Sequence, residues 1–260
     1  MKSDAVLQTI NPDSPSDMKS LFGKIAGRYD TMNRIMSLGL DRLWRRAAIR
    51  GIEIPEGGRI LDPACGTGDF TVEIARRWPD SRITGVDLTP EMIDIARKKL
   101  SDAGGVTFLA GDAQNLSMLE TQGYSLIVCA FGFRNFPDKA KALSECRKLL
   151  APGGRLIVLE LFRPVSRTLG LLVDTWLSVV SRLFASGASA EYLYLRRSVA
   201  NTVSAGEFAD LAEGCGFAVN SSRFMPPAAT CITLTKAESV QRESVSPSPT
   251  SSRTTTPAAM

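Results

Sequence analysis

Short apolar runs alternate with helical segments through the middle of this 260-residue chain. The runs occupy residues 59–62, 82–87, 106–110, 124–130 and 155–161. Parallel strands that helices cover on both faces read as nearly continuous apolar runs, whereas strands with one wet face alternate apolar and polar residues. Because helical segments separate the runs, the pattern predicts an α/β fold with a doubly wound, mostly parallel sheet.

Two weaker runs near the C-terminal end complete the predicted sheet. They lie at residues 217–222 and 229–234, after a predicted helix at 206–214. With this pair the sheet has seven strands, and we expect the folded domain to span residues 18–236.

The two ends of the chain differ in composition from the middle. Residues 1–17 are polar with two prolines, and residues 237–260 are rich in Ser, Thr and Pro. Such segments bury too little apolar surface to offset the entropy of ordering them. We therefore expect a flexible N-terminal arm and a disordered C-terminal tail.

The composition excludes several kinds of chemistry. The chain has no histidine, which removes Ser–His and Cys–His nucleophile pairs, histidine proton shuttles and histidine metal sites. Its five cysteines are widely spaced and form no C-x-x-C pair, so we expect neither a disulfide framework nor a metal site. The net charge of +4 is too small to indicate a nucleic-acid partner.

The sequence predicts a cytoplasmic protein. Acidic residues and prolines stand near the N-terminus, where a signal peptide would need an apolar run. No uncharged apolar stretch reaches the length of about 18 residues that a membrane span requires. Unpaired cysteines also fit a reducing compartment.

The sharpest motif is a glycine-rich turn at residues 62–69, DPACGTGD, which follows a predicted strand and opens a helix. Backbone N–H groups in such a turn approach a ligand closely, and the helix N-terminus favours negative charge. Phe70 and Thr71 follow where the dinucleotide fingerprint would continue, and the Gly-Lys-Ser/Thr of a phosphate loop is missing. The turn therefore predicts a ligand site of another kind.

The D-x-x-C-G-x-G-D pattern resembles motif I of the class I S-adenosylmethionine-dependent methyltransferases, which have a Rossmann-like fold. The resemblance implies that S-adenosylmethionine is the cofactor. It also implies that the motif residues Asp62, Gly66, Thr67 and Gly68 bind it.

Two more acids follow predicted strands and support a cofactor site. Asp87 ends the second strand about 20 residues after the glycine turn, where a carboxylate can accept both ribose hydroxyls. Asp112 ends the third strand, where the resemblance implies a polar residue beside the adenine. Their neighbours Leu88 and Ala113 are expected to bind the same ligand. Either acid alone could be a helix N-cap, but together they meet at one edge of the sheet.

Three longer signatures resemble the ubiquinone/menaquinone biosynthesis C-methyltransferase family. They are residues 131–160, residues 22–33 with 37–45, and residues 192–199. The resemblance covers about residues 20–236, and residues 200–204 and 225–227 depart from the family pattern. No Asp/Asn-Pro-Pro-aromatic motif follows the fourth strand, which speaks against a nucleic-acid amino methyltransferase.

This resemblance implies C-methylation of a polyprenylated hydroquinone. Demethylmenaquinol is the expected substrate, because the compact N-terminal arm looks more like the menaquinone branch, and ubiquinone biosynthesis is a further role. An O- or N-methyltransferase of secondary metabolism remains an alternative. A non-catalytic cofactor-binding assembly protein is a more remote one.

Arg134 and Asn135, just after the fourth strand, are the catalytic candidates. Without histidine, the substrate hydroxyl must lose its proton to a carboxylate or to water, or a cation must stabilise the phenolate. A permanently charged guanidinium can hold a phenolate, and Asn135 could orient the hydroxyl. Arg134 could instead form a structural ion pair with Asp138 or Asp112.

Two helical regions are expected to enclose the substrate. A cap at 18–50 carries Tyr29 and Asn33, which we expect to bind the quinol ring. Helices at 163–200 would cover the substrate, and one of them carries Trp176, a third expected substrate contact.

The helix around Trp176 is amphipathic, and its spacing suits an apolar exit for the prenyl tail. The apolar stripe comprises Leu169, Leu172, Val173, Trp176, Leu177, Val180, Leu183 and Phe184. Arginines at 163, 167 and 182 flank the stripe and suit anionic headgroups, which predicts peripheral contact with the inner face of the membrane. The same helix could instead pack on the domain or on a partner in a homodimer.

Overall fold

The computed structural model describes residues 14–183 and 189–237. Its strands are β1 (Arg59–Asp62), β2 (Arg82–Asp87), β3 (Val106–Ala110), β4 (Tyr124–Ala130), β5 (Leu150–Glu160), β6 (Phe217–Met225) and β7 (Ala229–Lys236). They form one sheet in the order β3-β2-β1-β4-β5-β7-β6. Among these described strands β7 pairs antiparallel with both β5 and β6, and the other pairs are parallel. The predicted seven-stranded, mostly parallel α/β fold is confirmed.

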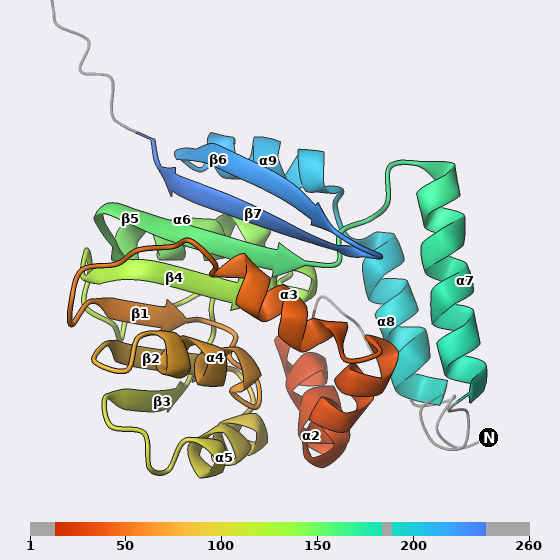
Figure 1. Cartoon of the computed structure of the whole chain (residues 1–260), viewed down its shortest axis with the longest axis horizontal. Helices are drawn as coiled ribbons and strands as arrows, with labels where there is room; N and C mark the ends of the chain where they lie inside the picture. The colour runs from red at the N-terminus through yellow and green to blue at the C-terminus, as the bar shows by residue number, and fades with distance from the viewer. Residues whose placement is uncertain (1–13, 184–188, 238–260) are drawn as a thin grey trace, which may run out of the picture.

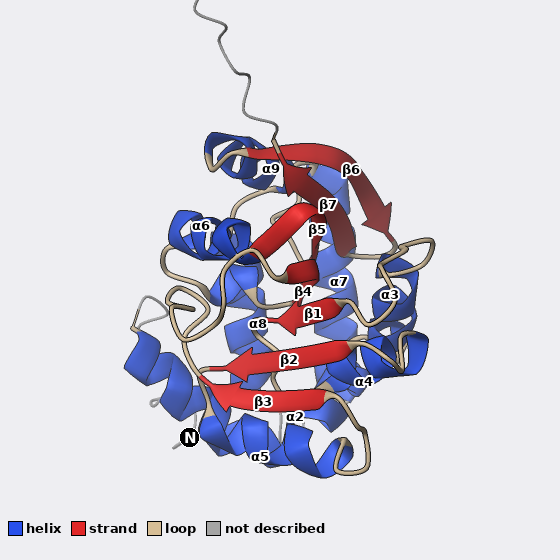
Figure 2. Cartoon of the chain, turned by 90° about the vertical axis from the view of Figure 1, so that its left-hand side faces the viewer, coloured by secondary structure: helices blue, strands red, loops and turns tan. Residues whose placement is uncertain are grey.

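Helices cover both faces of the sheet, as Figure 2 shows. They are α2 (Pro15–Met36), α3 (Leu40–Ala48), α4 (Asp69–Arg77), α5 (Pro90–Lys99), η1 (Phe133–Asn135), α6 (Lys139–Leu149), α7 (Arg167–Leu183), α8 (Ser189–Asn201) and α9 (Ala205–Gly214). Helices α6 and α9 lie on one face, and α3 and α4 lie on the other.

The central strand β4 explains why the runs are wholly apolar. Ile127 and Cys129 pack into the core beneath α6 and α9, whereas Leu126 and Val128 pack into the core beneath α3 and α4. All four side chains are fully buried. Successive side chains of a strand point to opposite faces, so a strand covered on both sides has no wet position. Each fully buried aliphatic side chain contributes about 1.5–3 kcal/mol.

The N-terminal helices cap the carboxyl ends of the parallel strands. In Figure 1, β1, β4 and β5 run toward α2, with α8 and α7 side by side beyond it. Helix α2 begins after Ser14, whose hydroxyl accepts a hydrogen bond from the Asp17 N–H. Helix α3 turns Trp44 inward, and its indole Nε1 donates to the Pro226 carbonyl at 3.0 Å. The site is therefore enclosed by the sheet edge and this cap.

Some element boundaries differ from the sequence prediction. Strand β5 begins at Leu150 instead of residue 155, because Leu150 pairs with Tyr124 before the register shifts through the Pro-Gly-Gly segment. Helix α2 begins at Pro15, three residues before the predicted cap. The predicted arm up to residue 13 and the predicted tail from residue 238 lie outside the described residues.

Part of the predicted apolar stripe also lies outside what the structure describes. This part comprises the side chains of Leu169, Leu172, Leu177, Val180, Leu183 and Phe184, with that of Arg182. Within the described ranges, no helix combines the length and the hydropathy needed to cross a membrane.

Candidate active site

The glycine turn connects β1 to α4 through two left-handed residues. Gly66 has φ +53° and Gly68 has φ +83°, a region in which residues with a Cβ are strained. Gly68 also sits close to α5, because a Cβ there would lie 3.1 Å from the Cβ of Ala96. The Gly66 N–H donates to the Asp87 carboxylate at 2.8 Å, which links the turn to the end of β2.

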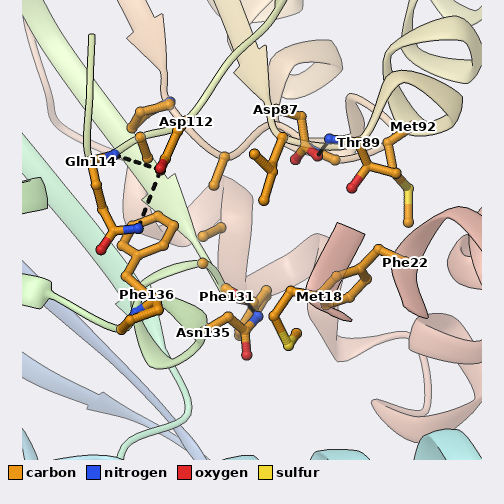
Figure 3. Close-up of a pocket in the computed structure, with 18 of the residues that line it drawn as sticks. Met18, Phe22, Asp87, Thr89, Met92, Asp112, Gln114, Phe131, Asn135 and Phe136 are labelled. Carbon is orange, nitrogen blue, oxygen red and sulfur yellow. Dashed lines mark hydrogen bonds between the residues drawn. The ribbon is translucent and has the colours of Figure 1, made fainter. Parts of the chain in front are cut away.

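A cavity opens where this turn meets the ends of β2, β3 and β4, and we call it the first cavity (Figure 3). It encloses about 750 Å³, including its open mouth. Its wall comprises Met18, Phe22, Tyr29, Pro63, Ala64, Gly66, Asp87, Leu88, Thr89, Met92, Asp112, Ala113, Gln114, Ala130, Phe131, Gly132, Asn135, Phe136 and Pro137. The cavity therefore combines two strand-end carboxylates with largely apolar and aromatic walls.

Asp87 is held rigidly at the end of β2. Its two carboxylate oxygens accept from the N–H groups of Gly66 at 2.8 Å and Thr89 at 2.9 Å. Burial raises the pKa of the Asp87 carboxyl above its ordinary value, while these two donors oppose the rise. Asp87 presents two carboxylate oxygens at the cavity wall, and such a pair of acceptors suits the two hydroxyls of a ribose.

Asp112 occupies the equivalent place after β3. Its carboxylate accepts from the Gln114 N–H at 2.8 Å and from Gln114 Nε2 at 3.3 Å (Figure 3). Gln114 Oε1 in turn accepts from the Asp138 N–H at 2.9 Å, where α6 begins. This chain of hydrogen bonds fixes the polar end of the cavity opposite Asp87.

Gly132, in the wall of the first cavity, is closely packed against its neighbours. A Cβ at Gly132 would lie 2.8 Å from both the Ala64 Cβ and the Cys129 Sγ. Only glycine allows the segment after β4 to approach the segment after β1 this closely. The cavity wall combines paired acceptors, a glycine turn and apolar side chains. This combination fits S-adenosylmethionine, which has a polar ribose, a flat adenine and a charged sulfonium.

Three predicted cofactor residues lie outside the cavity wall. Asp62 is buried behind the turn and accepts from the Thr71 hydroxyl at 2.9 Å. Burial raises the pKa of Asp62 to about 7. Thr67 is buried and donates to Asp30 of α2, and Gly68 packs against α5. Their direct contact with the cofactor stays a prediction, and their observed contacts shape the turn from behind.

A second cavity of about 410 Å³ adjoins the first. Its wall comprises Asn33, Met36, Ser37, Asp41, Trp44, Arg45, Phe131, Arg134, Leu161, Trp176 and Leu195. Three of the predicted catalytic and substrate residues, Asn33, Arg134 and Trp176, therefore meet here. Tyr29 and Asn135 line the first cavity instead.

Phe131 belongs to the walls of both cavities. It follows β4 with φ +59°, an uncommon conformation for a bulky side chain and a mark of a functionally constrained position. Its carbonyl oxygen accepts from Arg134 Nη1 at 2.7 Å and from Asn135 Nδ2 at 3.5 Å. The two catalytic candidates thus hold the residue at which the cavities adjoin.

Arg134 forms a buried ion pair with Glu160, a partner that the sequence did not suggest. Nη1 lies 2.7 Å from Glu160 Oε1, and the Arg134 N–H donates to Oε2 at 3.1 Å. The side chains are 7% and 1% exposed. Losing either partner would leave a buried charge uncompensated, which costs about 3–5 kcal/mol. Arg134 is therefore charged and fixed in place at the wall of the second cavity.

Several wall residues were missed at the sequence level. Met18 and Phe22, four residues apart on α2, have the spacing of ordinary core positions. Phe131 and Phe136 lie in the signature after β4, and their position beyond a strand end was the available signal. Gln114 follows Asp112 by two residues and could have been found in the same way.

Comparison with known proteins identifies a family across most of the chain. The model of the ubiE/COQ5 methyltransferase family matches residues 11–233. The demethylmenaquinone methyltransferase of Deinococcus radiodurans is 40% identical over 191 residues, covering 72% of this chain and 79% of that protein. The ubiquinone/menaquinone biosynthesis C-methyltransferase UbiE of Syntrophotalea carbinolica is 39% identical over 206 residues, covering 77% and 86%.

Solved structures show the same fold at low sequence identity. A SAM-dependent methyltransferase from Aquifex aeolicus has a TM-score of 0.60 at 15% identity, covering 82% of this chain and 97% of that one. The [4+2]-cyclase SpnF has a TM-score of 0.58 at 17% identity, covering 77% and 82%. Because a cyclase shares this fold, the fold alone does not define the reaction.

Proposed function

We propose that this chain, which belongs to the ubiE/COQ5 methyltransferase family and is an S-adenosylmethionine-dependent methyltransferase, methylates a ring carbon of a polyprenylated hydroquinone. The substrate is demethylmenaquinol, and the product is menaquinol. The relatives named for this reaction support the choice, since they share about two fifths of their residues with this chain over most of its length. We assign the activity to residues 18–236.

The observation that carries this proposal is the pair of cavities that share Phe131. The first cavity has the acceptors and apolar walls that suit S-adenosylmethionine. The second is lined by Trp44, Trp176 and aliphatic side chains, with arginine and asparagine among them, which suits an aromatic ring that carries hydroxyls. Cavities that meet at one residue hold their ligands close together, and positioning two reactants for transfer can contribute about 7–11 kcal/mol to catalysis.

When bound, S-adenosylmethionine supplies a methyl group on a positively charged sulfur. We assign Asp87 to the ribose and Asp112 to the adenine, with Gly66, Leu88 and Ala113 forming the adjoining wall. Asp62, Thr67 and Gly68 act on the cofactor through the shape of the turn.

The protein's task toward the quinol is to favour the ionised hydroxyl, because ionisation makes the ring carbon nucleophilic. Arg134 provides a positive charge at the wall of the second cavity, which lowers the pKa of a neighbouring phenol. Asn33 can hydrogen-bond a ring hydroxyl, and Asn135, on the side of the first cavity, can orient a hydroxyl or a water. Tyr29 and Trp176 enclose the reacting groups and exclude bulk water.

We further propose that α7 contacts the inner face of the membrane, from which a polyprenyl substrate must be withdrawn. Leu171 is 61% exposed, and Val165 and Val179 are also exposed large apolar side chains of this region. Arg167, at the start of the helix, is exposed and suits anionic headgroups. A second copy of the chain is the other occupant that would cover this face, and it would make the protein a homodimer.

The test is methyl transfer from S-adenosylmethionine that carries a trideuterated methyl group. Purified protein is incubated with chemically reduced demethylmenaquinone and, in parallel, with a benzoquinol that lacks its ring methyl. Oxidised demethylmenaquinone is the matched control, because it has no ionisable hydroxyl. Mass spectrometry with fragmentation then locates the label.

We expect the label on a ring carbon of the naphthoquinol and no transfer to the oxidised control. Label on the benzoquinol as well would extend the role to ubiquinone biosynthesis. Label on oxygen, or no transfer to either quinol although the cofactor binds, would contradict the proposal and favour a secondary-metabolite methyltransferase.

A further inference from the structure

The cap contributes a second guanidinium to the second cavity, that of Arg45 on α3. Arg45 is 6% exposed and lines this cavity beside Asp41, which is 2% exposed. Arg45 Nη1 donates to Asp41 Oδ2 at 2.6 Å. The Ser37 hydroxyl donates to Asp41 Oδ1 at 3.0 Å, and Arg34 Nη1 lies 3.2 Å from the same oxygen. Asp41 therefore holds Arg45 in one orientation.

Arg45 retains hydrogen-bonding capacity beyond this ion pair. Its Nε is buried and has no hydrogen-bond partner among the residues that the structure describes. The guanidinium carbon lies 5.3 Å from the centre of the Phe131 ring, the residue shared by both cavities. A buried donor without an acceptor is unfavourable, and more so on a charged group. Arg45 also lines the second cavity, where an oxygen of a ligand can lie against its guanidinium.

The carboxylates around the cavity already have other partners. Asp41 is paired with Arg45 and Arg34 and accepts a hydrogen bond from Ser37, and Glu160 is paired with Arg134. Asp62, beneath the glycine turn, interacts with Arg45 electrostatically and is bonded to Thr71. Arg45 is thus a wall residue whose guanidinium is held in one orientation, and an anionic oxygen is the ligand that suits such a cation.

We propose that Arg45 binds the ionised hydroxyl oxygen of the hydroquinone during methyl transfer, an inference that rests on the proposed function. The hydroxyl proton passes to water, and its electron pair stays on the oxygen, where the guanidinium stabilises the charge. The ring carbon then forms its bond to the methyl carbon as the methyl–sulfur bond breaks. The proton on that ring carbon leaves to water and restores the aromatic ring. Asp41 is the positioning residue for Arg45.

The test measures the ionisation of a redox-inert naphthol, 4-methoxy-1-naphthol, bound together with S-adenosylhomocysteine. The naphtholate absorbs at longer wavelength than the naphthol, so a pH titration gives the pKa of the bound probe. We compare wild type, R45K and R45Q with R42Q, which changes an exposed arginine on the same helix. The pH dependence of kcat for demethylmenaquinol is recorded on the same proteins.

We expect the pKa of the bound probe to be lowered in wild type and in R42Q. In R45Q the pKa should be about one unit higher than in wild type, which is a tenfold weaker preference for the anion. The acidic limb of the kcat profile should move in the same direction, and R45K should lie between the two. Binding of S-adenosylhomocysteine should be unchanged. Identical titrations for R45Q and R42Q would overturn the inference.

Two controls separate the sources of failure. D41N/R45Q replaces the buried ion pair by a neutral pair, so it reports the loss of the cation even where R45Q alone does not fold. The pKa of the probe bound to D41N/R45Q must rise as it does with R45Q. If it does not rise, the inference is wrong. If wild type methylates no quinol yet still ionises the naphthol through Arg45, the proposed function fails and the anion site stands.

Discussion

Asp62 shows how a single buried carboxyl supports the site without touching the cavity. It ends β1, accepts a hydrogen bond from Thr71 at 2.9 Å, and lies beneath the turn that carries Gly66. Burial raises its pKa from 3.8 to about 7, so the native state binds a proton that the unfolded chain releases. The turn therefore rests on a poorly solvated carboxyl, and its protonation couples the stability of the fold to pH.

This coupling predicts that stability falls as pH rises. The stabilisation from the neutral acid is fully present below about pH 4 and is lost as the pH approaches about 7, up to roughly 4 kcal/mol. D62N keeps a neutral acceptor for Thr71 and should flatten this dependence in urea unfolding between about pH 5 and about pH 8. The exposed D94N on α5 is the control. Parallel pH profiles for wild type and D62N would refute the prediction.

Asp87 acts on the ligand side of the same turn. D87A removes a charged acceptor from the cavity wall, and hydrogen bonds to charged groups contribute about 1.5–3 kcal/mol. Affinity for S-adenosylhomocysteine should therefore fall about 10- to 100-fold by calorimetry, whereas D94A should bind as wild type does. Unchanged affinity in D87A would place the ribose elsewhere.

At the scale of the element, α7 carries both packed and exposed apolar side chains. Val173 packs against Leu195 and Val199 of α8, and Trp176 lines the second cavity. Leu171 and Val179, about two turns apart, are exposed. Large apolar side chains that stay exposed on a helix suit a second apolar environment. The membrane is the environment we propose for the outer face.

We predict that L171D weakens binding to vesicles that contain anionic lipid by about tenfold, because burying a leucine contributes about 1.5–3 kcal/mol. Flotation measures this loss. L43D on α3 is the matched control, since Leu43 is 57% exposed and belongs to another helix. Equal binding by the two variants would remove the membrane assignment. Loss of a dimer in L171D by sedimentation would instead assign this face to a second copy.

At the scale of the molecule, much of the fold was predictable, because strands buried on both faces appear in the sequence as nearly continuous apolar runs. The runs at 106–110 and 124–130 coincide with β3 and β4. The strand-end acids Asp87 and Asp112 were predictable as well, since parallel strands bring their carboxyl ends to one edge.

The rest of the site depends on contacts that leave no local pattern. Glu160 pairs with Arg134 because β5 lies beside β4, although the two residues are 26 positions apart. The left-handed φ of Phe131 and the two cavities that it lines have no local sequence signal either. Arg45 gives no local signal either, because its burial comes from the packing of α3 against one face of the sheet.

The central claim is that cofactor and quinol occupy two cavities that meet at Phe131. The most direct measurement is a crystal structure with S-adenosylhomocysteine and 4-methoxy-1-naphthol. We predict the ribose hydroxyls on Asp87 in the first cavity, and the naphthol ring beside Arg45 and Trp176 in the second. A naphthol bound away from Phe131, or a ribose away from Asp87, would contradict the account.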